Sequence, residues 1–557
     1  MNLTRKPSNL IVKFKFKKNG DIVKKYLLIV FSVIFCAYAQ EKNELIILHT
    51  TDVHGNIYSY DYFRDQPSNS GLSRIYTKVK EYRQKYKNVL LLDSGDLLQG
   101  TPLVYYFNHI NTSLPNPMIL VMNYMRYDAF AVGNHDIEQG YFTYYKAMKE
   151  SDFPWLSANG EMTDGSTYFK PYTIIEKDGI KIGIIGLTTP AIPMWLDKSL
   201  YPGIEWKDMV VSAKKYAQEL RSKVDVLIGL FHAGMNAEYN VKYTDTYGIP
   251  NENASKLVAE NVPDFDIILC GHSHRVFPTE NENPLINNTV MVMSGSHGSY
   301  LGVVKINFEK TKITSRSASI IPMESFDPAQ EILAITKPYH EQTLKYIRQE
   351  IGTVLDTLSA KNSYWQDTPL VELINRAQMA ATGADMSFAA SFNQNVFIPP
   401  GPILVKDIYG MYRYENFLYL VEMSGQQIID YLEYCARFFI YDNKTNKVIK
   451  NPEMAGYNYD MAEGISYVID VSEESGDRIK EVIVQKSGEP IDLHGRYKVT
   501  LNSYRASGGG GHLAAIGINK PKILWQSNEE MRNILIEYIR DKGQLDGKVD
   551  GNWKLVK

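Results

Sequence analysis

Residues 45–56 read LIILHTTDVHGN, an uncharged apolar run followed at once by polar residues, and this stretch decides the fold of the N-terminal half. The apolar run is short, which fits a buried β-strand. Side chains alternate along an extended strand, so Asp52 and His54, two residues apart, can point to the same side. The stretch therefore predicts a strand that ends in two potential metal ligands.

The same arrangement recurs further along the chain. Apolar runs end in polar loops at VLLL before Asp93, AFAV before Gly133, IGIIGL before Thr188, VLIGLF before His232, IILC before Gly271 and VMVM before Ser294. Helix-like segments, among them residues 71–86 and 209–224, lie between several of these runs, giving the β–α alternation of a layered α/β domain. Ligands gather at strand ends in α/β folds, so we expect these loops to share one site.

The rest of the chain predicts a second domain, because 557 residues are too many for one hydrophobic core. An amphipathic stretch at residues 327–352 opens with Asp327-Pro328 and is expected to be a linker helix. It divides the α/β domain, residues 40–326, from a C-terminal domain, residues 353–557. There the pattern predicts helices at 370–381 and 529–542 and strands at 417–423, 465–471, 479–485 and 497–501, a mixture typical of an α+β domain.

Residues 1–39 have the composition of a signal peptide. Eight Lys/Arg precede or flank an uncharged run from Tyr26 to Ala39, which is short for a bilayer span and ends in a small-x-small site, Ala37-Tyr38-Ala39. We expect cleavage before Gln40 and export to the periplasm, the cell envelope or the exterior. An uncleaved membrane anchor is the alternative.

Residues 40–557 form an acidic chain, with 52 Lys/Arg against 62 Asp/Glu and a formal net charge of −10. This charge argues against a nucleic-acid polymer as partner. Only Cys270 and Cys435 remain, in different predicted domains, so we expect no disulfide framework. No second apolar run approaches membrane-spanning length, so we expect no stable membrane insertion after cleavage. The sequence leaves the oligomeric state open.

Five segments supply candidate metal ligands in a fixed order. They are Asp52 and His54, then Asp96 in DSGD, then Asn134 in GNHD, then His232, and finally His272 and His274 in GHSH. Each fragment alone is common, but the ordered set resembles the calcineurin-like metallophosphoesterases, and this resemblance implies a four-layer α/β sandwich. It implies that Asp52, His54, Asp96 and His274 hold one metal and that Asp96, Asn134, His232 and His272 hold the other. Mixed imidazole, carboxylate and amide ligands suit Zn, Mn, Fe or Co.

His135 is left over from the ligand set. In the family that this set resembles, the histidine after the ligand asparagine stabilises the transition state or protonates the leaving group, and an acidic residue orients it. Glu138 stands at the orienting position and Asp136 is closer in sequence, so both are candidates. We expect His49, Asp93 and His297 to be structural.

The full chain resembles the 5′-nucleotidase family, with C-terminal marks in YENFLYLVEMSG at 414–425, GISY at 464–467 and NSYRASGG at 502–509. These segments look more like the 2′,3′-cyclic-nucleotide 2′-phosphodiesterase/3′-nucleotidase branch of that family. The resemblance implies that Tyr414 and Tyr504 sandwich the base and that Asn416 bonds the base or ribose. Arg505 is a candidate for a phosphate or ribose contact, and Asn393 and Gly464 are further candidates for substrate contacts. Stacking is plausible chemistry, since any base presents a π-face.

The resemblance also narrows the class of nucleotide that we expect as substrate. Members that act on 5′-nucleotides carry arginines near the start of the second domain, which meet phosphate bidentately. Here the equivalent stretches, 391–395 and 366–372, contain none. We therefore expect a hydrolase of 2′,3′-cyclic nucleotides and 3′-nucleotides. The alternatives are a 5′-nucleotidase or UDP-sugar hydrolase and an inactive nucleotide-binding surface protein.

Overall fold

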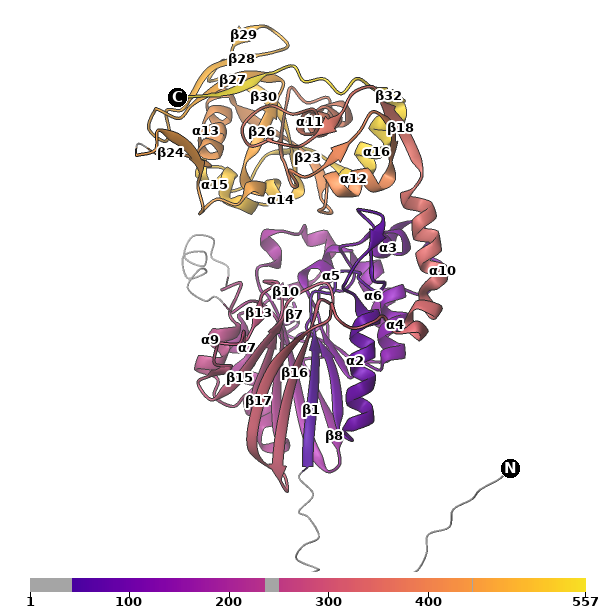
Figure 1. Cartoon of the computed structure of the whole chain (residues 1–557). Helices are drawn as coiled ribbons and strands as arrows, with labels where there is room; N and C mark the ends of the chain where they lie inside the picture. The colour runs from indigo at the N-terminus through magenta and orange to yellow at the C-terminus, as the bar shows by residue number, and fades with distance from the viewer. Residues whose placement is uncertain (1–42, 236–249, 443) are drawn as a thin grey trace, which may run out of the picture.

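The computed structural model describes residues 43–235, 250–442 and 444–557, which form two domains (Figure 1). The expected signal peptide lies outside the described residues. Helix α10 (Gln330–Ile347) runs along one side of the N-terminal domain and leads into the C-terminal domain. Among the helices of these three segments, none is both long and apolar enough to cross a membrane.

Two β-sheets form the centre of the N-terminal domain, and each of the seven apolar runs is a strand in one of them. In spatial order the first sheet contains β17 (Lys312–Pro322), β16 (Tyr300–Glu309), β1 (Asn43–Thr50), β4 (Val89–Asp93), β5 (Ala129–Ala131) and β6 (Trp155–Leu156). The second contains β13 (Val276–Phe277), β15 (Thr289–Ser294), β12 (Ile267–Cys270), β11 (Val226–His232), β9 (Ile180–Thr188) and β8 (Tyr172–Lys177), with β14 (Leu285–Ile286) beside β15.

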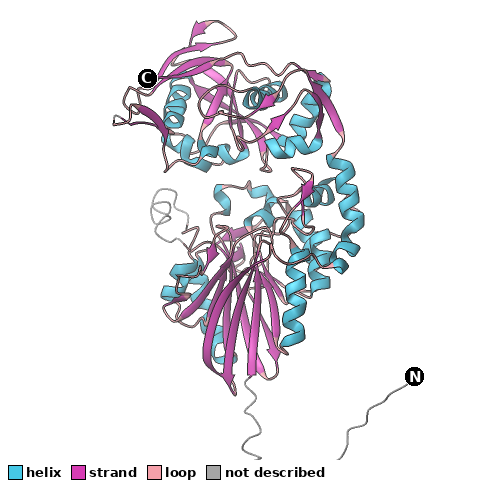
Figure 2. Cartoon of the chain, viewed as in Figure 1, coloured by secondary structure: helices cyan, strands magenta, loops and turns pink. Residues whose placement is uncertain are grey.

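The domain has four layers, as the sequence implied (Figure 2). Buried aliphatic side chains of both sheets pack against each other, among them Ile47, Leu92 and Ile228. On the outer face of the first sheet lie α2 (Leu72–Lys85), α4 (Pro117–Met125) and α10, and on that of the second lie α7 (Met209–Leu220) and α9 (Ser255–Asn261). The central strands of each sheet are buried on both faces, which explains why they read as continuous apolar runs.

Strand direction brings the polar loops together. Strands β1, β4, β5 and β6 are parallel, and so are β9, β11, β12 and β15. Their carboxyl ends therefore meet at the edge of the sandwich that faces the C-terminal domain (Figure 1).

The C-terminal domain is α+β. Its main sheet contains, in order, β26 (Asp460–Glu463), β20 (Met386–Ala390), β30 (Arg496–Asn502), β23 (Phe417–Ser424) and β31 (Ile523–Glu530). A second sheet contains β29 (Glu489–Pro490), β28 (Ile479–Val484), β27 (Ile465–Asp470) and β33 (Trp553–Val556). The main helices are α11 (Pro369–Thr382), α12 (Val405–Met411), α13 (Gly425–Ala436) and α16 (Met531–Lys542). Cys270 and Cys435 are both buried and free.

Candidate active site

The seven candidate ligands come from the carboxyl ends of both sheets. Asp52 and His54 follow β1, Asp96 follows β4 and Asn134 begins α5 (Asn134–Glu138) after β5. His232 is the last residue of β11, and His272 and His274 follow β12. The structure thus places residues up to 222 positions apart in the chain, Asp52 to His274, at one point of the fold.

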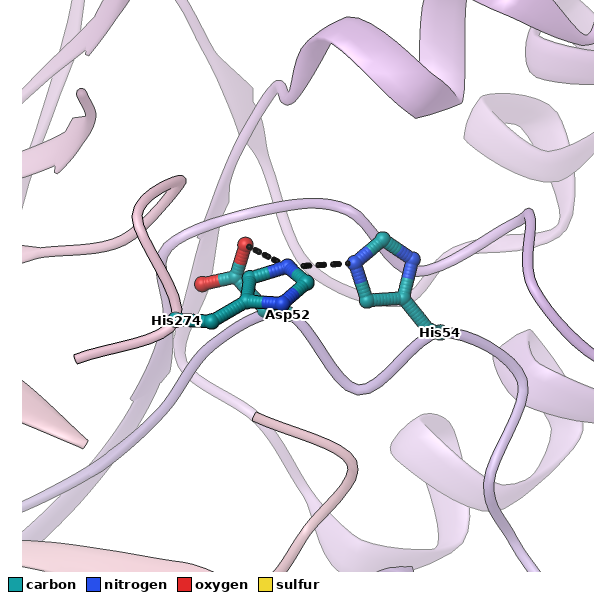
Figure 3. A group of neighbouring side chains, drawn as sticks. All are labelled: Asp52, His54 and His274. Carbon is teal, nitrogen blue, oxygen red and sulfur yellow. Dashed lines mark hydrogen bonds and ion pairs between the residues drawn. The ribbon is translucent and has the colours of Figure 1, made fainter. Parts of the chain in front are cut away.

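Asp52, His54 and His274 form the first group, with one potential ligand atom of each within 4.8 Å of the others (Figure 3). The Nε2 atoms of His54 and His274 lie 3.0 Å apart, and Asp52 Oδ1 lies 3.4 Å from His274 Nε2. His54 Nδ1 faces the carbonyl of Gln99 at 3.2 Å and must donate to it. Burial lowers the pKa of His54 to about 3, so this imidazole is neutral, with the lone pair of Nε2 facing the group.

Asp96, His232 and His272 form the second group, also within 4.8 Å of one another. His232 Nε2 lies 3.1 Å from Asp96 Oδ2 and 3.0 Å from the side-chain oxygen of Asn134, and its Nδ1 faces the carbonyl of Ser94 at 2.7 Å. Burial opposes protonation of His232, but Asp96 outweighs it and raises the pKa to about 9. Oxygen atoms of Asp96, Asn134 and Ser94 thus converge on the His232 ring and require a positive charge there. Either a proton on His232 or a divalent cation in its place would supply that charge.

Asp96 connects the two groups. Its Oδ2 atom lies 3.1 Å from His232 Nε2 in the second group and 3.9 Å from His54 Nε2 in the first. Its other oxygen, Oδ1, accepts the backbone N–H of His135 at 2.8 Å. One carboxylate oxygen is therefore held by the protein, while the other stands between the two ligand groups.

The backbone is strained where the ligands gather. Asp52, His54, Asp96, His272 and His274 all have positive φ, between 49° and 73°, a conformation that L-residues rarely adopt. Such conformations cost of order 1–3 kcal/mol each and persist where function requires them. Gly133 is needed for a related reason, since a Cβ there would lie 2.2 Å from Asp96 Oδ1. The residues thus fit two cations in donor type, convergence and strain.

His135 and Glu138 are brought together as expected, whereas Asp136 has another task. Glu138 Oε2 lies 2.5 Å from His135 Nδ1. Burial opposes protonation of His135, but Glu138 and Asp96 outweigh it and raise its pKa to about 10. The Asp136 carboxylate instead accepts backbone N–H groups of Gly133 and of residues 96–98, at 2.8–3.0 Å. Asp136 therefore shapes the loop that carries Asp96 and does not orient His135.

Two of the three residues expected to be structural are so. His49 contacts the hydroxyls of Ser294 and Ser94, at 2.7 and 2.9 Å, and Asp93 accepts from Thr50 and the N–H of Gly95. The expectation for His297 was wrong. Its ring centroid lies 5.6 Å from that of His54 and 5.7 Å from that of His274, so it lines the site.

Sequence reasoning missed two residues beside the second group. Glu252 Oε1 lies 2.9 Å from His272 Nε2, and the rings of Trp195 and His272 are 5.5 Å apart. Neither lies directly after an apolar run that predicts a strand, so the pattern that found the other residues gives no signal for them.

The candidate base site lies on two adjoining segments of the C-terminal domain. Tyr414 is 42% exposed and its ring lies 5.1 Å from that of Phe392. Asn416 Oδ1 accepts from the hydroxyl of Ser503 at 3.2 Å, which joins the Tyr414 segment to the Tyr504 segment. A Cβ at Gly509 would lie 2.6 Å from the Tyr504 ring, so this glycine lets the ring pack on the backbone.

Arg505 is not available to substrate, contrary to expectation. It is 2% exposed, and its guanidinium donates twice to Asp460, at 2.8 and 2.9 Å, and to the carbonyl of Tyr457 at 2.6 Å. The exposed arginine that sequence reasoning overlooked is Arg413, which lies close enough to His297 to lower the pKa of that histidine, after burial and His274. The positive charge of Arg413 thus acts on a histidine that lines the metal-ligand site.

The remaining two candidates for substrate contacts, Asn393 and Gly464, are explained by the local backbone conformation. The side chain of Asn393 accepts the N–H of Asn395 at 3.1 Å, which closes a turn next to Phe392. Gly464 has φ 86°, and a Cβ there would lie 2.3 Å from the carbonyl oxygen of Asp385. The packing of β26 against β20 thus explains this glycine, and a substrate contact is not needed.

The chain is similar to known proteins over most of its length. The family model of the calcineurin-like phosphoesterases matches residues 45–276, and that of the 5′-nucleotidase C-terminal domain matches residues 350–516. The 2′,3′-cyclic-nucleotide 2′-phosphodiesterase/3′-nucleotidase of Haemophilus influenzae is 28% identical over 92% of this chain and 87% of its own length. The trifunctional nucleotide phosphoesterase protein YfkN of Bacillus subtilis is 29% identical over 92% of this chain, which spans only 39% of that protein.

Solved structures show the same similarity. The calcineurin-like phosphoesterase YfkN from Bacillus subtilis is 30% identical, with a TM-score of 0.50 over 55% of this chain and 100% of that one. A 5′-nucleotidase precursor from Thermus thermophilus is similar in fold, with a TM-score of 0.63 and 22% identity over 92% of this chain and 100% of its own.

Proposed function

Because the chain belongs to the calcineurin-like phosphoesterases and carries a 5′-nucleotidase C-terminal domain, we propose that it is a dinuclear-metal hydrolase that opens 2′,3′-cyclic nucleotides and releases phosphate from 3′-nucleotides. The family is one of metal-dependent phosphoester hydrolases, and the relatives named for nucleotide substrates support the substrate class. The charge-neutral apolar run within residues 1–39 supports the further proposal of export.

The position of Asp96 Oδ2 between the two ligand groups is the observation that carries this proposal. Asp52, His54, Asp96 and His274 would hold one ion, and Asp96, Asn134, His232 and His272 the other. When bound, two divalent ions neutralise phosphoryl oxygens and generate a hydroxide nucleophile at neutral pH. Histidines whose Nδ1 donates to a backbone carbonyl are fixed in the tautomer that such ions require.

His135 would handle the proton of the leaving group. Glu138 occupies its Nδ1, so Nε2 is the nitrogen left to face a substrate oxygen. The raised pKa of His135 favours the protonated form, which can donate to the oxygen that leaves phosphorus. Its ring lies 5.4 Å from that of His54, which places the proton donor at the edge of the first ligand group.

Base recognition would fall to the C-terminal domain. Tyr414 and Tyr504 offer ring faces for stacking, worth about 1–3 kcal/mol per base. The exposed Arg413, whose charge acts on His297, would offer a guanidinium to the phosphate or ribose in place of the buried Arg505.

Phosphate release from 2′,3′-cyclic AMP, 3′-AMP and 5′-AMP, compared in parallel with Mn²⁺ or Zn²⁺ added, tests the proposal. We expect the first two to be turned over well above 5′-AMP. Preference for 5′-AMP would instead indicate that the protein is a 5′-nucleotidase. No turnover of any nucleotide, together with tight nucleotide binding, would favour the binding-protein alternative.

The same assay, carried out with the variant Tyr414→Ala, tests whether Tyr414 stacks on the base. Loss of one stacking face should raise KM roughly 5- to 150-fold and change kcat less, because the ring is remote from the reacting atoms. Phe142→Ala is the matched control, since Phe142 is 86% exposed on the N-terminal domain. Equal kinetics for both variants would remove Tyr414 from the base site.

A further inference from the structure

A buried polar network crosses the interface between the domains beside the candidate active site. Its members, called the interface network here, are Gln139 and His109 of the N-terminal domain and Glu415, Glu530 and Arg532 of the C-terminal domain. Gln139, Glu415 and Arg532 are 6%, 4% and 1% exposed. Polar side chains this deeply buried require partners, so their contacts constrain how the two domains meet.

On the N-terminal side the network begins one residue from the catalytic pair. Gln139 follows Glu138, which contacts His135. The Oε1 atom of Gln139 accepts from the side-chain amide of Asn108 at 3.1 Å and lies 3.1 Å from His109 Nε2. These contacts fix the amide so that its Nε2 points across the interface, where it donates to Glu415 Oε2 at 2.5 Å.

On the C-terminal side the network ends in the candidate base site. Glu415 stands between Tyr414 and Asn416 in the chain. Its Oε1 lies 2.7 Å from Nη2 of Arg532, which also lies 3.2 Å from Glu530 Oε2. The guanidinium carbon of Arg532 lies 4.8 Å from the ring centre of Tyr105, in the N-terminal domain, and 4.6 Å from that of Tyr409, in α12.

The charges of the network balance in this arrangement. Burial and the neighbouring Glu415 raise the pKa of Glu530 to about 8, so Glu530 is mostly protonated near neutral pH. Arg532 then faces one carboxylate, that of Glu415. A shift of the domains that separated Glu415 from Gln139 would leave a buried carboxylate short of a donor, which is costly.

We propose that Glu415 and Gln139 are positioning residues, whose hydrogen bond across the interface holds the base-recognition segment in register with the His135–Glu138 pair. This inference rests on the proposed function, because it concerns a substrate whose base and phosphate occupy different domains. Misplacement of a reacting group by about 1 Å can cost on the order of 100-fold in rate. When the base is bound in the C-terminal domain, this hydrogen bond thus aligns the phosphate with the His135–Glu138 pair.

An exchange of the two side chains tests the inference. Gln139→Glu places a carboxylate opposite Glu415, and we expect kcat for the preferred nucleotide to fall on the order of 100-fold. The dissociation constant for adenosine should stay within about twofold, because the base site lies in the C-terminal domain. In the double variant Gln139→Glu/Glu415→Gln the amide and the carboxylate are exchanged, the hydrogen bond can form again, and we expect kcat to recover at least about tenfold.

Lys406→Gln is the matched control. It breaks another contact across the domains, Lys406 to Asp65 at 3.3 Å, which involves no member of the interface network. We expect wild-type kinetics within about twofold, because the pair is only partly buried and Asp65 keeps Arg348 as a partner. Wild-type kinetics for Gln139→Glu, or no recovery in a double variant that folds and still binds adenosine, would overturn the inference.

The proposed function fails in a different way. Wild-type protein that hydrolyses p-nitrophenyl phosphate, an ester without a base, but no nucleotide would overturn the proposed substrate class before any interface variant is made. Wild-type turnover of nucleotides with no effect of the interface variants would overturn the inference alone.

Discussion

Asp96→Asn is expected to lower phosphate release from the preferred nucleotide on the order of a thousandfold. The change replaces the carboxylate oxygen between the two ligand groups, which lies 3.1 Å from His232 Nε2 and 3.9 Å from His54 Nε2. Metal charge contributes several kcal/mol to phosphoryl transfer, and each 1.36 kcal/mol corresponds to tenfold in rate. The measurement is kcat/KM together with metal content by elemental analysis, and both should fall.

Asp152→Asn is the control for this prediction, because Asp152 is an exposed aspartate of the same domain. It should match the wild type in rate and metal content. A fully active Asp96→Asn protein that holds two ions would show that Asp96 does not bridge them.

His135→Ala is expected to lower kcat by roughly 10²- to 10⁴-fold, the range for loss of a general acid. The metal content should not change, because the His135 ring belongs to neither ligand group and its backbone N–H, which serves Asp96, remains. Glu138→Gln should reduce kcat less, since it weakens only the group that orients His135.

His494→Ala is the control, since His494 is exposed in the C-terminal domain. Loss of metal from His135→Ala would contradict the separation of the acid from the ligand set. An undiminished kcat would assign the proton transfer to another group, with His297 next in position.

The strands, and the meeting of the candidate ligands at one edge of the sheets, could be predicted from sequence because one local pattern indicates both. An apolar run long enough for one buried strand, followed within four residues by Asp, Asn or His, places the polar side chain near the sheet edge wherever the strand lies. Asp52, His232 and His272 all follow this pattern, and parallel strand order then brings them together. Neither the placing of polar residues at strand ends nor the meeting of those ends depends on particular side-chain contacts between residues far apart in the sequence.

The assignments of Asp136 and Arg505 depended on such contacts and were wrong. Asp136 lies beside His135 in the chain, yet its carboxylate is taken by backbone N–H groups of the loop after β4. Arg505 stands in a motif that suggests substrate binding, but Asp460, 45 residues earlier, binds its guanidinium. Arg413 could not be chosen from its sequence neighbours, because its electrostatic effect on His297 depends on how the two domains meet.

Metal titration of chelator-treated protein tests the central claim most directly, with phosphate release from the preferred nucleotide and bound metal per chain measured on the same samples. We expect the stripped protein to be inactive and its activity to return as Mn²⁺ or Zn²⁺ is added, reaching its full value only as the second ion per chain binds. Full activity in the metal-free protein, or a plateau at one ion per chain, would contradict a dinuclear centre built on Asp96.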